Sequence, residues 1–241
     1  MDRVKTGIPE LDDLLGGGFP EGSTILVSGA SGTGKTIFCM QYLYWGITVE
    51  GEPGIMVTFE ERPADLRREC LQFGWDLAPL EEEGKLAIVD VTSTRSGAPS
   101  REKFVAPRDM GVEALITTVY QIGRELGATR VGIDSIPALG LMYEDRSELR
   151  RNLFKLSNLL LEMGVTAIMT TEKPMDGYLG TYGFEEYLTR GVIALSIEEA
   201  NGQLRRSLIV RKMRETNHSM TRVPYEITKE GIKIVPAGRL V

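Results

Sequence analysis

The sequence has few residues that commonly bind metals or form disulfides: one histidine and two cysteines among 241 residues. Cys39 and Cys70 fall in segments with helical spacing of apolar residues, and neither has a second cysteine or a histidine at metal-ligand spacing. We therefore expect two buried, reduced thiols. The lone histidine, His218, gives no functional signal when taken by itself.

Long apolar runs are also missing. No run approaches the roughly 18 to 20 residues that span a bilayer, and the first residues lack the apolar core of a signal peptide, so we expect a cytosolic protein. The chain has no low-complexity tract, repeat or linker, and its 42% apolar and 26% charged residues are typical of a globular protein. These features predict a single α/β domain over residues 1–241. The net charge of −6 argues against a protein that coats nucleic acid through its overall field.

Short β-rich runs alternate with runs of helical spacing through most of the chain. We expect strands at 23–28, 54–59, 86–90, 130–134 and 165–171, and helices at 35–49, 63–73, 112–126 and 147–163. This alternation predicts a mostly parallel central sheet flanked by helices on both faces. The later strands, at 192–197 and 204–211 with a turn at Asn201-Gly202 and then a hairpin around 229–231, predict a C-terminal antiparallel extension. Two stretches, 91–109 and 172–184, look irregular and follow strand ends, where ligands bind in open α/β sheets.

A phosphate-binding loop follows the first of these strands. Its eight residues match G-x-x-x-x-G-K-[ST] and are Gly29, Ala30, Ser31, Gly32, Thr33, Gly34, Lys35 and Thr36. Glycines let backbone N–H groups turn toward phosphate oxygens, Lys35 neutralises the β and γ phosphates, and Thr36 offers a hydroxyl to Mg²⁺. A glycine-rich turn with an exposed lysine is the weaker alternative, because a strand precedes this loop and a helix follows it. The motif predicts binding of ATP with Mg²⁺.

Three acids stand at strand ends. Asp134 ends an apolar strand, where it is a candidate to hold Mg²⁺ through water beside Thr36; the alternative is an aspartate that caps the turn before Pro137. Glu60 and Glu61 follow the strand at 54–59, and one of them is a candidate base for the water that attacks the γ phosphate. The alternative for this pair is a favourable acidic start to the next helix.

The late strands carry a basic run, which consists of Arg205, Arg206, Arg211, Lys212 and Arg214. Alternation places Lys212 and Arg214 on one face of a strand, from which both can reach one anion. The run is either a charged strand edge that resists aggregation or a source of arginine-finger contacts.

Several spaced segments resemble the RecA-type ATPases, in particular their KaiC-like branch, over nearly the whole chain. They are Thr6-Gly-Ile-Pro-Glu-Leu-Asp-Asp-Leu-Leu-Gly-Gly-Gly-Phe19, Phe59-Glu-Glu-Arg-Pro63, Phe73-Gly-Trp75-Asp-Leu, Thr170-Thr-Glu172, Gly183-Phe-Glu-Glu-Tyr187 and Lys212-Met-Arg214-Glu-Thr216-Asn-His218. The resemblance implies a RecA-like P-loop core in a hexameric ring, with ATP bound between subunits.

The resemblance also assigns roles to residues. It implies that Glu60 and Glu61 are the catalytic glutamates and that Lys212 and Arg214 reach the γ phosphate of the neighbour's ATP. Thr216, His218 and Thr228 would contact the nucleotide; Lys229 stands where the family has an aspartate. A single domain implies a single-layered ring, and Glu186-Tyr187 replaces the Ser-Thr pair that a related autokinase domain phosphorylates. We therefore expect hydrolysis without autokinase activity.

Three functions are compatible with these residues. The leading one is a ring ATPase whose nucleotide state signals to protein partners. The second is a recombination protein that binds single-stranded DNA, with Arg95, Arg101, Lys103, Arg108 and Lys173 as loop cations and Tyr178 and Tyr182 as candidates to stack on bases. The negative charges of Asp109 and Glu102 partly offset the positive charge of these cations. The third is a nucleotide-binding structural subunit of a larger machine.

Overall fold

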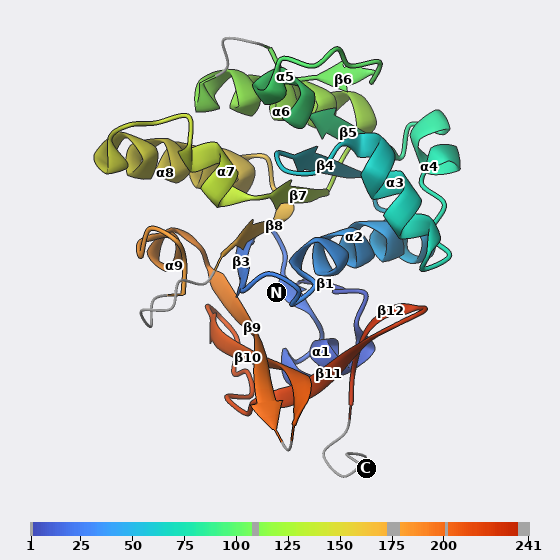
Figure 1. The fold of residues 1–241 in the computed structure, drawn as a ribbon, viewed down its shortest axis with the longest axis vertical. Coiled ribbons are helices and arrows are strands. Elements are labelled where there is room, and N and C mark those ends of the chain that lie inside the picture. The colour runs from blue at the N-terminus through green and yellow to red at the C-terminus, as the bar shows by residue number, and fades with distance from the viewer. Residues whose placement is uncertain (1, 108–110, 173–178, 201, 236–241) are drawn as a thin grey trace.

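The computed structural model describes residues 2–107, 111–172, 179–200 and 202–235. Within these ranges ten strands form one mixed sheet, in the order β12-β11-β10-β9-β3-β8-β7-β4-β5-β6 (Figure 1). The strands are β3 (Thr24–Gly29), β4 (Gly54–Thr58), β5 (Leu86–Asp90), β6 (Phe104–Val105), β7 (Arg130–Asp134), β8 (Thr166–Thr171), β9 (Gly191–Ala200), β10 (Gln203–Met213), β11 (Val223–Thr228) and β12 (Gly231–Ile234). A small second sheet pairs β1 (Arg3–Val4) with β2 (Phe19–Pro20).

The strands from β9 to β6 in this order pair in parallel, whereas β9 to β12 pair antiparallel. Every residue of β3, β4, β5, β7 and β8 is buried. Burial on both faces explains their nearly continuous apolar sequences. The predicted fold class, a mostly parallel sheet with C-terminal antiparallel strands, is therefore confirmed.

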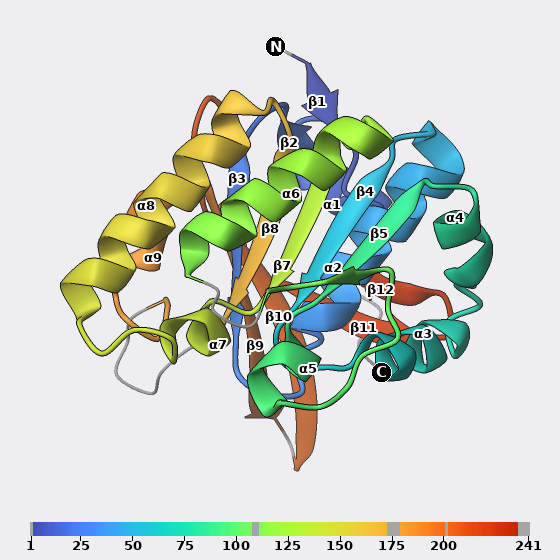
Figure 2. The same cartoon turned by 90° about the horizontal axis from the view of Figure 1, so that it is seen from above.

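Helices cover both faces of the sheet (Figure 2). They are α1 (Pro9–Leu14), α2 (Lys35–Trp45), the π-helix η1 (Gly46–Glu50), α3 (Pro63–Leu71), α4 (Ala78–Glu82), α5 (Thr92–Ser96), α6 (Val112–Leu126), α7 (Ile136–Gly140), α8 (Arg146–Glu162) and α9 (Glu185–Leu188). Helices α6 and α8 pack on one face in a core with Val57 and Ile133, and α2 packs on the other with Val27 and Ile193. The α/β alternation places the ends of β3, β4 and β7 at one edge of the sheet.

The long helix expected at 35–49 is a shorter α-helix followed by a π-helix. The buried guanidinium of Arg130 lies against Gly46, where an added Cβ would stand 2.1 Å from Arg130 Nε. Arg130 Nη1 donates to the carbonyl of Tyr42 at 3.0 Å, and Arg130 Nε pairs with Glu52 at 2.6 Å. The sequence pattern does not reveal this packing, because it depends on a side chain from a distant strand.

The stretch at 91–109, expected to be irregular, contains α5 and β6. Asp90 helps to hold this stretch in place, since its Oδ1 accepts from the N–H of Ser93 at 2.9 Å and its Oδ2 accepts from the hydroxyl of Ser100 at 2.6 Å. Arg108, Asp109, Lys173, Tyr178 and Asn201, which figured in the sequence predictions, lie outside the described residues.

Cys39 and Cys70 are both free and buried, as expected. Burial raises the pKa of each thiol, that of Cys70 to about 12. Among the described residues, no helix is long and apolar enough to cross a membrane.

Candidate functional site

The loop at residues 29–36 connects β3 to the first turn of α2. Gly34 has φ of +87°, a conformation that glycine adopts without strain. Gly29 is fixed by space instead, because an added Cβ would lie 2.5 Å from Thr33 Oγ1. The Thr33 hydroxyl donates to the carbonyl of Ala30 at 2.8 Å, and Lys35 Nζ donates to the same carbonyl at 3.3 Å. The loop is thus closed on itself at the positive end of α2, as anion binding requires.

Thr36 and Asp134 meet beside this loop. The Thr36 hydroxyl donates to Asp134 Oδ2 at 2.7 Å, and the Thr170 hydroxyl donates to Asp134 Oδ1. Asp134 is only 5% exposed, and burial raises its pKa. A hydroxyl and a buried carboxylate are hard oxygen donors that suit Mg²⁺. The described residues contain no group of three or more acids, histidines or cysteines able to hold a metal.

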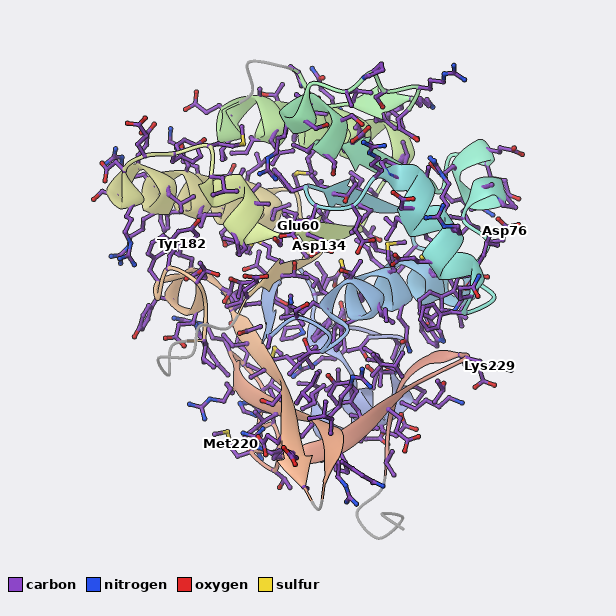
Figure 3. All side chains as sticks on the ribbon, viewed as in Figure 1. Glu60, Asp76, Asp134, Tyr182, Met220 and Lys229 are labelled. Atoms are coloured by element: carbon purple, nitrogen blue, oxygen red, sulfur yellow. The ribbon has the colours of Figure 1, made fainter. Side chains whose placement is uncertain are left out.

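Glu60 and Glu61 lie at the end of β4, next to β7. The N–H of Phe59 donates to the carbonyl of Asp134 at 2.7 Å, and the hydroxyl of Ser135 donates to Glu60 Oε1. Figure 3 shows Glu60 and Asp134 close together above α2. The two acids predicted from separate strand ends are therefore neighbours.

Glu61 has a different environment from that of Glu60. Its side chain is half-buried, and its Oε2 is buried without a hydrogen-bond partner among the described residues. Burial, followed by the charges of Glu69, Asp134, Glu60 and Asp65, raises the pKa of Glu61 to about 7. A carboxylate with a pKa near neutrality has the basicity that a general base needs.

An apolar cavity of about 230 Å³ opens between α2 and α3, beside Thr36. Its lining residues are Thr36, Ile37, Met40, Leu66, Glu69, Cys70, Gln72, Phe73 and Trp75. Phe73 and Trp75 stack with ring centroids 4.8 Å apart. No sequence motif marks this cavity, although Phe73 and Trp75 belong to a segment that resembles the KaiC-like ATPases.

Lys212 and Arg214 lie away from the P-loop of their own chain, Lys212 level with the middle of β3 and Arg214 level with its start. Lys212 of β10 pairs with Val192 of β9, which pairs with Leu26 of β3. The N–H of Arg214 donates to the carbonyl of Arg190, and the N–H of Arg190 donates to the carbonyl of Thr24. Thr24 begins β3, whereas the P-loop follows its end. At about 3.3 Å per residue, the backbone of Arg214 lies roughly 16 Å along the strands from the end of β3, and that of Lys212, which is level with Leu26, lies roughly 10 Å from it. Neither cation lies beside the phosphate site of its own chain.

Two contacts hold Lys212 in this position. Its Nζ donates to the carbonyls of Glu186 at 2.9 Å and Thr189 at 2.5 Å. Burial and then the neighbouring charge of Arg214 lower the pKa of Lys212. The guanidinium of Arg214 is exposed and makes no hydrogen bond to the described residues.

Thr216 and His218 lie near Arg214, but Thr228 does not. The Thr216 hydroxyl accepts from Arg3 Nη1 at 2.6 Å, and His218 Nδ1 lies 3.1 Å from the carbonyl of Ser219. Thr228 stands at the tip of the β11–β12 hairpin, beside Lys229 (Figure 3). That hairpin packs on α2, since Gln41 accepts from the N–H of Ile232 at 2.7 Å. The structure thus separates Thr228 from the other two proposed nucleotide contacts.

Of the candidate DNA-contacting residues that the structure describes, Arg95, Lys103 and Tyr182 make internal contacts, whereas Arg101 is exposed. Tyr182 stacks on Phe184 at 5.8 Å between ring centroids, and its hydroxyl donates to the carbonyl of Pro137 at 3.3 Å. Arg95 Nη1 donates to the carbonyl of Phe59 at 2.9 Å, and Lys103 lies over the ring of Phe104. These contacts do not favour stacking of Tyr182 on a nucleic-acid base.

Comparison with known proteins gives consistent results. The family profile described as "ATPase: KaiC" matches residues 4–239. A UPF0273 protein of Methanocaldococcus jannaschii is 44% identical, with 98% of this chain and 97% of that protein covered. The circadian clock oscillator protein KaiC of Thermosynechococcus vestitus is 40% identical over all of this chain, which spans 45% of that protein. The crystal structure of a KaiC-like protein from Pyrococcus horikoshii aligns with a TM-score of 0.86 at 46% identity, covering 98% of this chain and 99% of that one.

Proposed function

The chain belongs to the KaiC family of P-loop ATPases, and we propose that it hydrolyses ATP with Mg²⁺ in a ring, at sites shared between neighbouring subunits. The distance between the P-loop and the cations of the same chain is the observation that carries this proposal. In a ring of like-oriented subunits, Arg214 of one protomer can face the P-loop of the next.

The nucleotide would lie over the P-loop with its phosphates at the start of α2. Lys35 and the loop N–H groups would neutralise and bind the phosphates, and Thr36 with Asp134 would hold Mg²⁺. When bound, this ion stabilises the charge that develops on the phosphoryl oxygens. The cavity beside Thr36 is apolar and next to stacked aromatic rings, which suits a planar base.

Glu61 would act as the base that accepts the proton of the attacking water. Its half-buried carboxylate has a raised pKa of about 7, so it can accept a proton near neutral pH. Glu60, held by Ser135, would orient the same water or fix the position of Glu61. Because Glu60 already accepts a hydrogen bond from the Ser135 hydroxyl and Glu61 has the raised pKa, Glu61 is the better base.

Lys212 and Arg214 would complete the site of the neighbouring subunit. The guanidinium of Arg214 is exposed and makes no hydrogen bond to the described residues, so it can bind an anion on another protomer. Thr216 and His218 lie in the same segment and would contact the neighbour's nucleotide. Thr228, on the hairpin that packs against α2, is better placed to contact the nucleotide of its own chain.

The proposed biological role is a nucleotide-controlled regulatory module in the cytosol. One relative is described as a circadian clock oscillator protein, and the ATPase domain it shares with this chain supports a link between nucleotide state and partner binding. Glu186-Tyr187 lacks hydroxyl acceptors of the Ser-Thr kind. We therefore expect ATP hydrolysis without phosphorylation of the protein itself.

The test is a steady-state ATPase assay on wild type and on the double variant Glu60→Gln/Glu61→Gln, combined with a nucleotide-binding measurement. We expect turnover to fall by about 10²- to 10⁴-fold while ATP still binds. Unchanged turnover would reject the roles of both glutamates. Wild type that binds ATP but does not hydrolyse it would instead support a structural nucleotide-binding subunit.

A further inference from the structure

Two side chains of the C-terminal strands contact the P-loop from outside. Tyr225 of β11 donates its hydroxyl to the carbonyl of Thr33 at 2.6 Å, and Arg206 of β10 donates Nε to the carbonyl of Gly32 at 3.1 Å. Arg206 and Tyr225 are directly opposite each other in the β10–β11 register. One cross-strand pair therefore holds two consecutive carbonyls of the loop, nearly two hundred residues away in sequence.

These contacts fix the direction of the loop's N–H groups. Each peptide unit is planar and trans, so the carbonyl of one residue and the N–H of the next point in opposite directions. A donor that holds the Thr33 carbonyl on the outside turns the N–H of Gly34 toward the inside of the loop. Inward N–H groups are what a P-loop offers to phosphate oxygens.

Packing restricts the same peptide further. Gly34 has φ of +87°, and a Cβ there would stand 2.8 Å from Ile227 Cδ1. Ile227 is on the same strand as Tyr225 and two residues beyond it, so both side chains project from the same face of β11. Tyr225 itself is 2% exposed, and water cannot easily replace its hydrogen bond.

We propose that Tyr225 is a positioning residue for nucleotide binding, which holds the Thr33–Gly34 peptide in its phosphate-binding orientation, with Arg206 supporting the adjacent Gly32–Thr33 peptide. The inference rests on the proposed binding of ATP at the P-loop. It adds that the antiparallel strands β10 and β11 preform the phosphate site of their own chain. Without the Tyr225 hydroxyl, the peptide loses its outer partner, and binding must supply the energy to orient it.

The test is Tyr225→Phe, which removes one hydroxyl and keeps the ring. Tyr42→Phe is the matched control, because the Tyr42 hydroxyl is also buried and donates to a backbone carbonyl, that of Thr166 at 2.9 Å. Calorimetric titration with MgADP and with a non-hydrolysable MgATP analogue would give Kd for each variant, and thermal denaturation would report stability.

We expect both variants to lose similar stability but only Tyr225→Phe to weaken nucleotide binding, by about fivefold. The Michaelis constant should rise more than kcat falls. Equal Kd values for Tyr225→Phe and wild type, or an equal loss in Tyr42→Phe, would overturn the inference. Wild type that binds no nucleotide would instead refute the proposed function, so the two failures are distinguishable.

A second pair of variants, at Arg206 and Arg205 of β10, tests the same inference. Arg206→Gln removes the charged donor to Gly32, and Arg205→Gln removes the adjacent half-buried arginine, which donates no hydrogen bond to the described residues. We expect weaker nucleotide binding in Arg206→Gln than in Arg205→Gln at the same ionic strength. Identical affinities in the two variants would contradict the role given to β10.

Discussion

The hydroxyl of Thr36 and the carboxylate of Asp134 lie 2.7 Å apart, although 98 residues separate them in the chain. Thr36 lies in the first turn of α2 and Asp134 ends β7, so the contact joins the P-loop to the carboxyl end of another strand. The remaining oxygen of Asp134 accepts from Thr170 at the end of β8. Two strand ends and the first turn of α2 thus meet at one buried carboxylate.

This relationship predicts the effect of Asp134→Asn. Since an amide removes the charge that would hold Mg²⁺ through water, we expect the apparent Mg²⁺ affinity or the turnover to fall by about 10- to 100-fold. The measurement is ATPase rate against Mg²⁺ concentration at fixed ATP. Asp90→Asn is the matched control, because Asp90 is equally buried at the end of β5 but bonds Ser93 and Ser100 instead. Equal effects of the two substitutions would contradict the metal role of Asp134.

The raised pKa of Glu61 predicts that the stability of the nucleotide-free protein depends on pH. Its pKa of about 7 in the folded state exceeds the ordinary value of 4.5, so the folded state binds the proton more tightly. The stabilisation that this proton provides is complete below pH 4.5 and is lost as pH rises through 7. The ionised form is held among Glu60, Asp65, Glu69 and Asp134.

Glu61→Gln should therefore raise Tm relative to wild type at pH 8, and the difference should shrink at pH 5. Thermal denaturation at the two pH values, without Mg²⁺ or nucleotide, measures this. Glu60→Gln is the control, because Glu60 is exposed and hydrogen-bonded to Ser135. A difference in Tm that is the same at both pH values would show that Glu61 does not titrate as described.

The buried guanidinium of Arg130 predicts a large loss of stability in Glu52→Gln. Arg130 is fully buried, and Glu52 is its one ion-pair partner among the described residues. The guanidinium also donates to the carbonyls of Lys5 and Tyr42 and lies over the ring of Tyr42. Removing the partner of a buried charge costs about 3 kcal/mol. Urea denaturation measures the loss.

The comparison for that experiment is Asp65→Asn, which breaks the exposed pair between Asp65 and Arg68. Such surface pairs contribute less than about 1 kcal/mol. If Glu52→Gln costs no more than Asp65→Asn, the pair is not the main support of the Arg130 charge.

The sequence predicted the parallel strands and the positions of the glycine-rich loop and the strand-end acids, because each depends on local pattern; the roles of these residues stay predictions. Strand ends in a parallel sheet share one edge, so Glu60, Asp134 and Thr36 could be expected together. The cavity beside Thr36 and the contact of Tyr225 with Thr33 could not, since both depend on how distant elements pack. No periodicity or motif marks Tyr225 as a partner of the P-loop.

The location of the basic residues also depends on how distant strands pair, which the sequence pattern does not reveal. Alternation grouped Lys212 with Arg214 but could not say how far both lie from the P-loop, which follows from the β9–β10 register and the pairing of β9 with β3. Thr228 was grouped with Thr216 and His218 by resemblance, yet hairpin packing places it beside α2. The roles of these residues, the ring and the cytosolic location stay predictions.

The measurement that tests the central claim most directly is ATPase activity in mixtures of two inactive variants. Lys35→Ala removes the P-loop cation and keeps Arg214, whereas Arg214→Ala keeps the P-loop and loses the cation that the neighbour needs. Each variant alone should have little activity, with a loss of about 10³-fold for the Arg214 variant. The two proteins are mixed in equal amounts under conditions that allow subunits to exchange.

If sites are shared, the mixture should recover roughly a quarter of wild-type activity, because half of the sites have an intact P-loop and half of those face an intact Arg214. The control is the same total concentration of each variant measured separately after the same treatment. A mixture, shown to have exchanged subunits, that is no more active than the sum of its components would contradict a site completed by the next subunit.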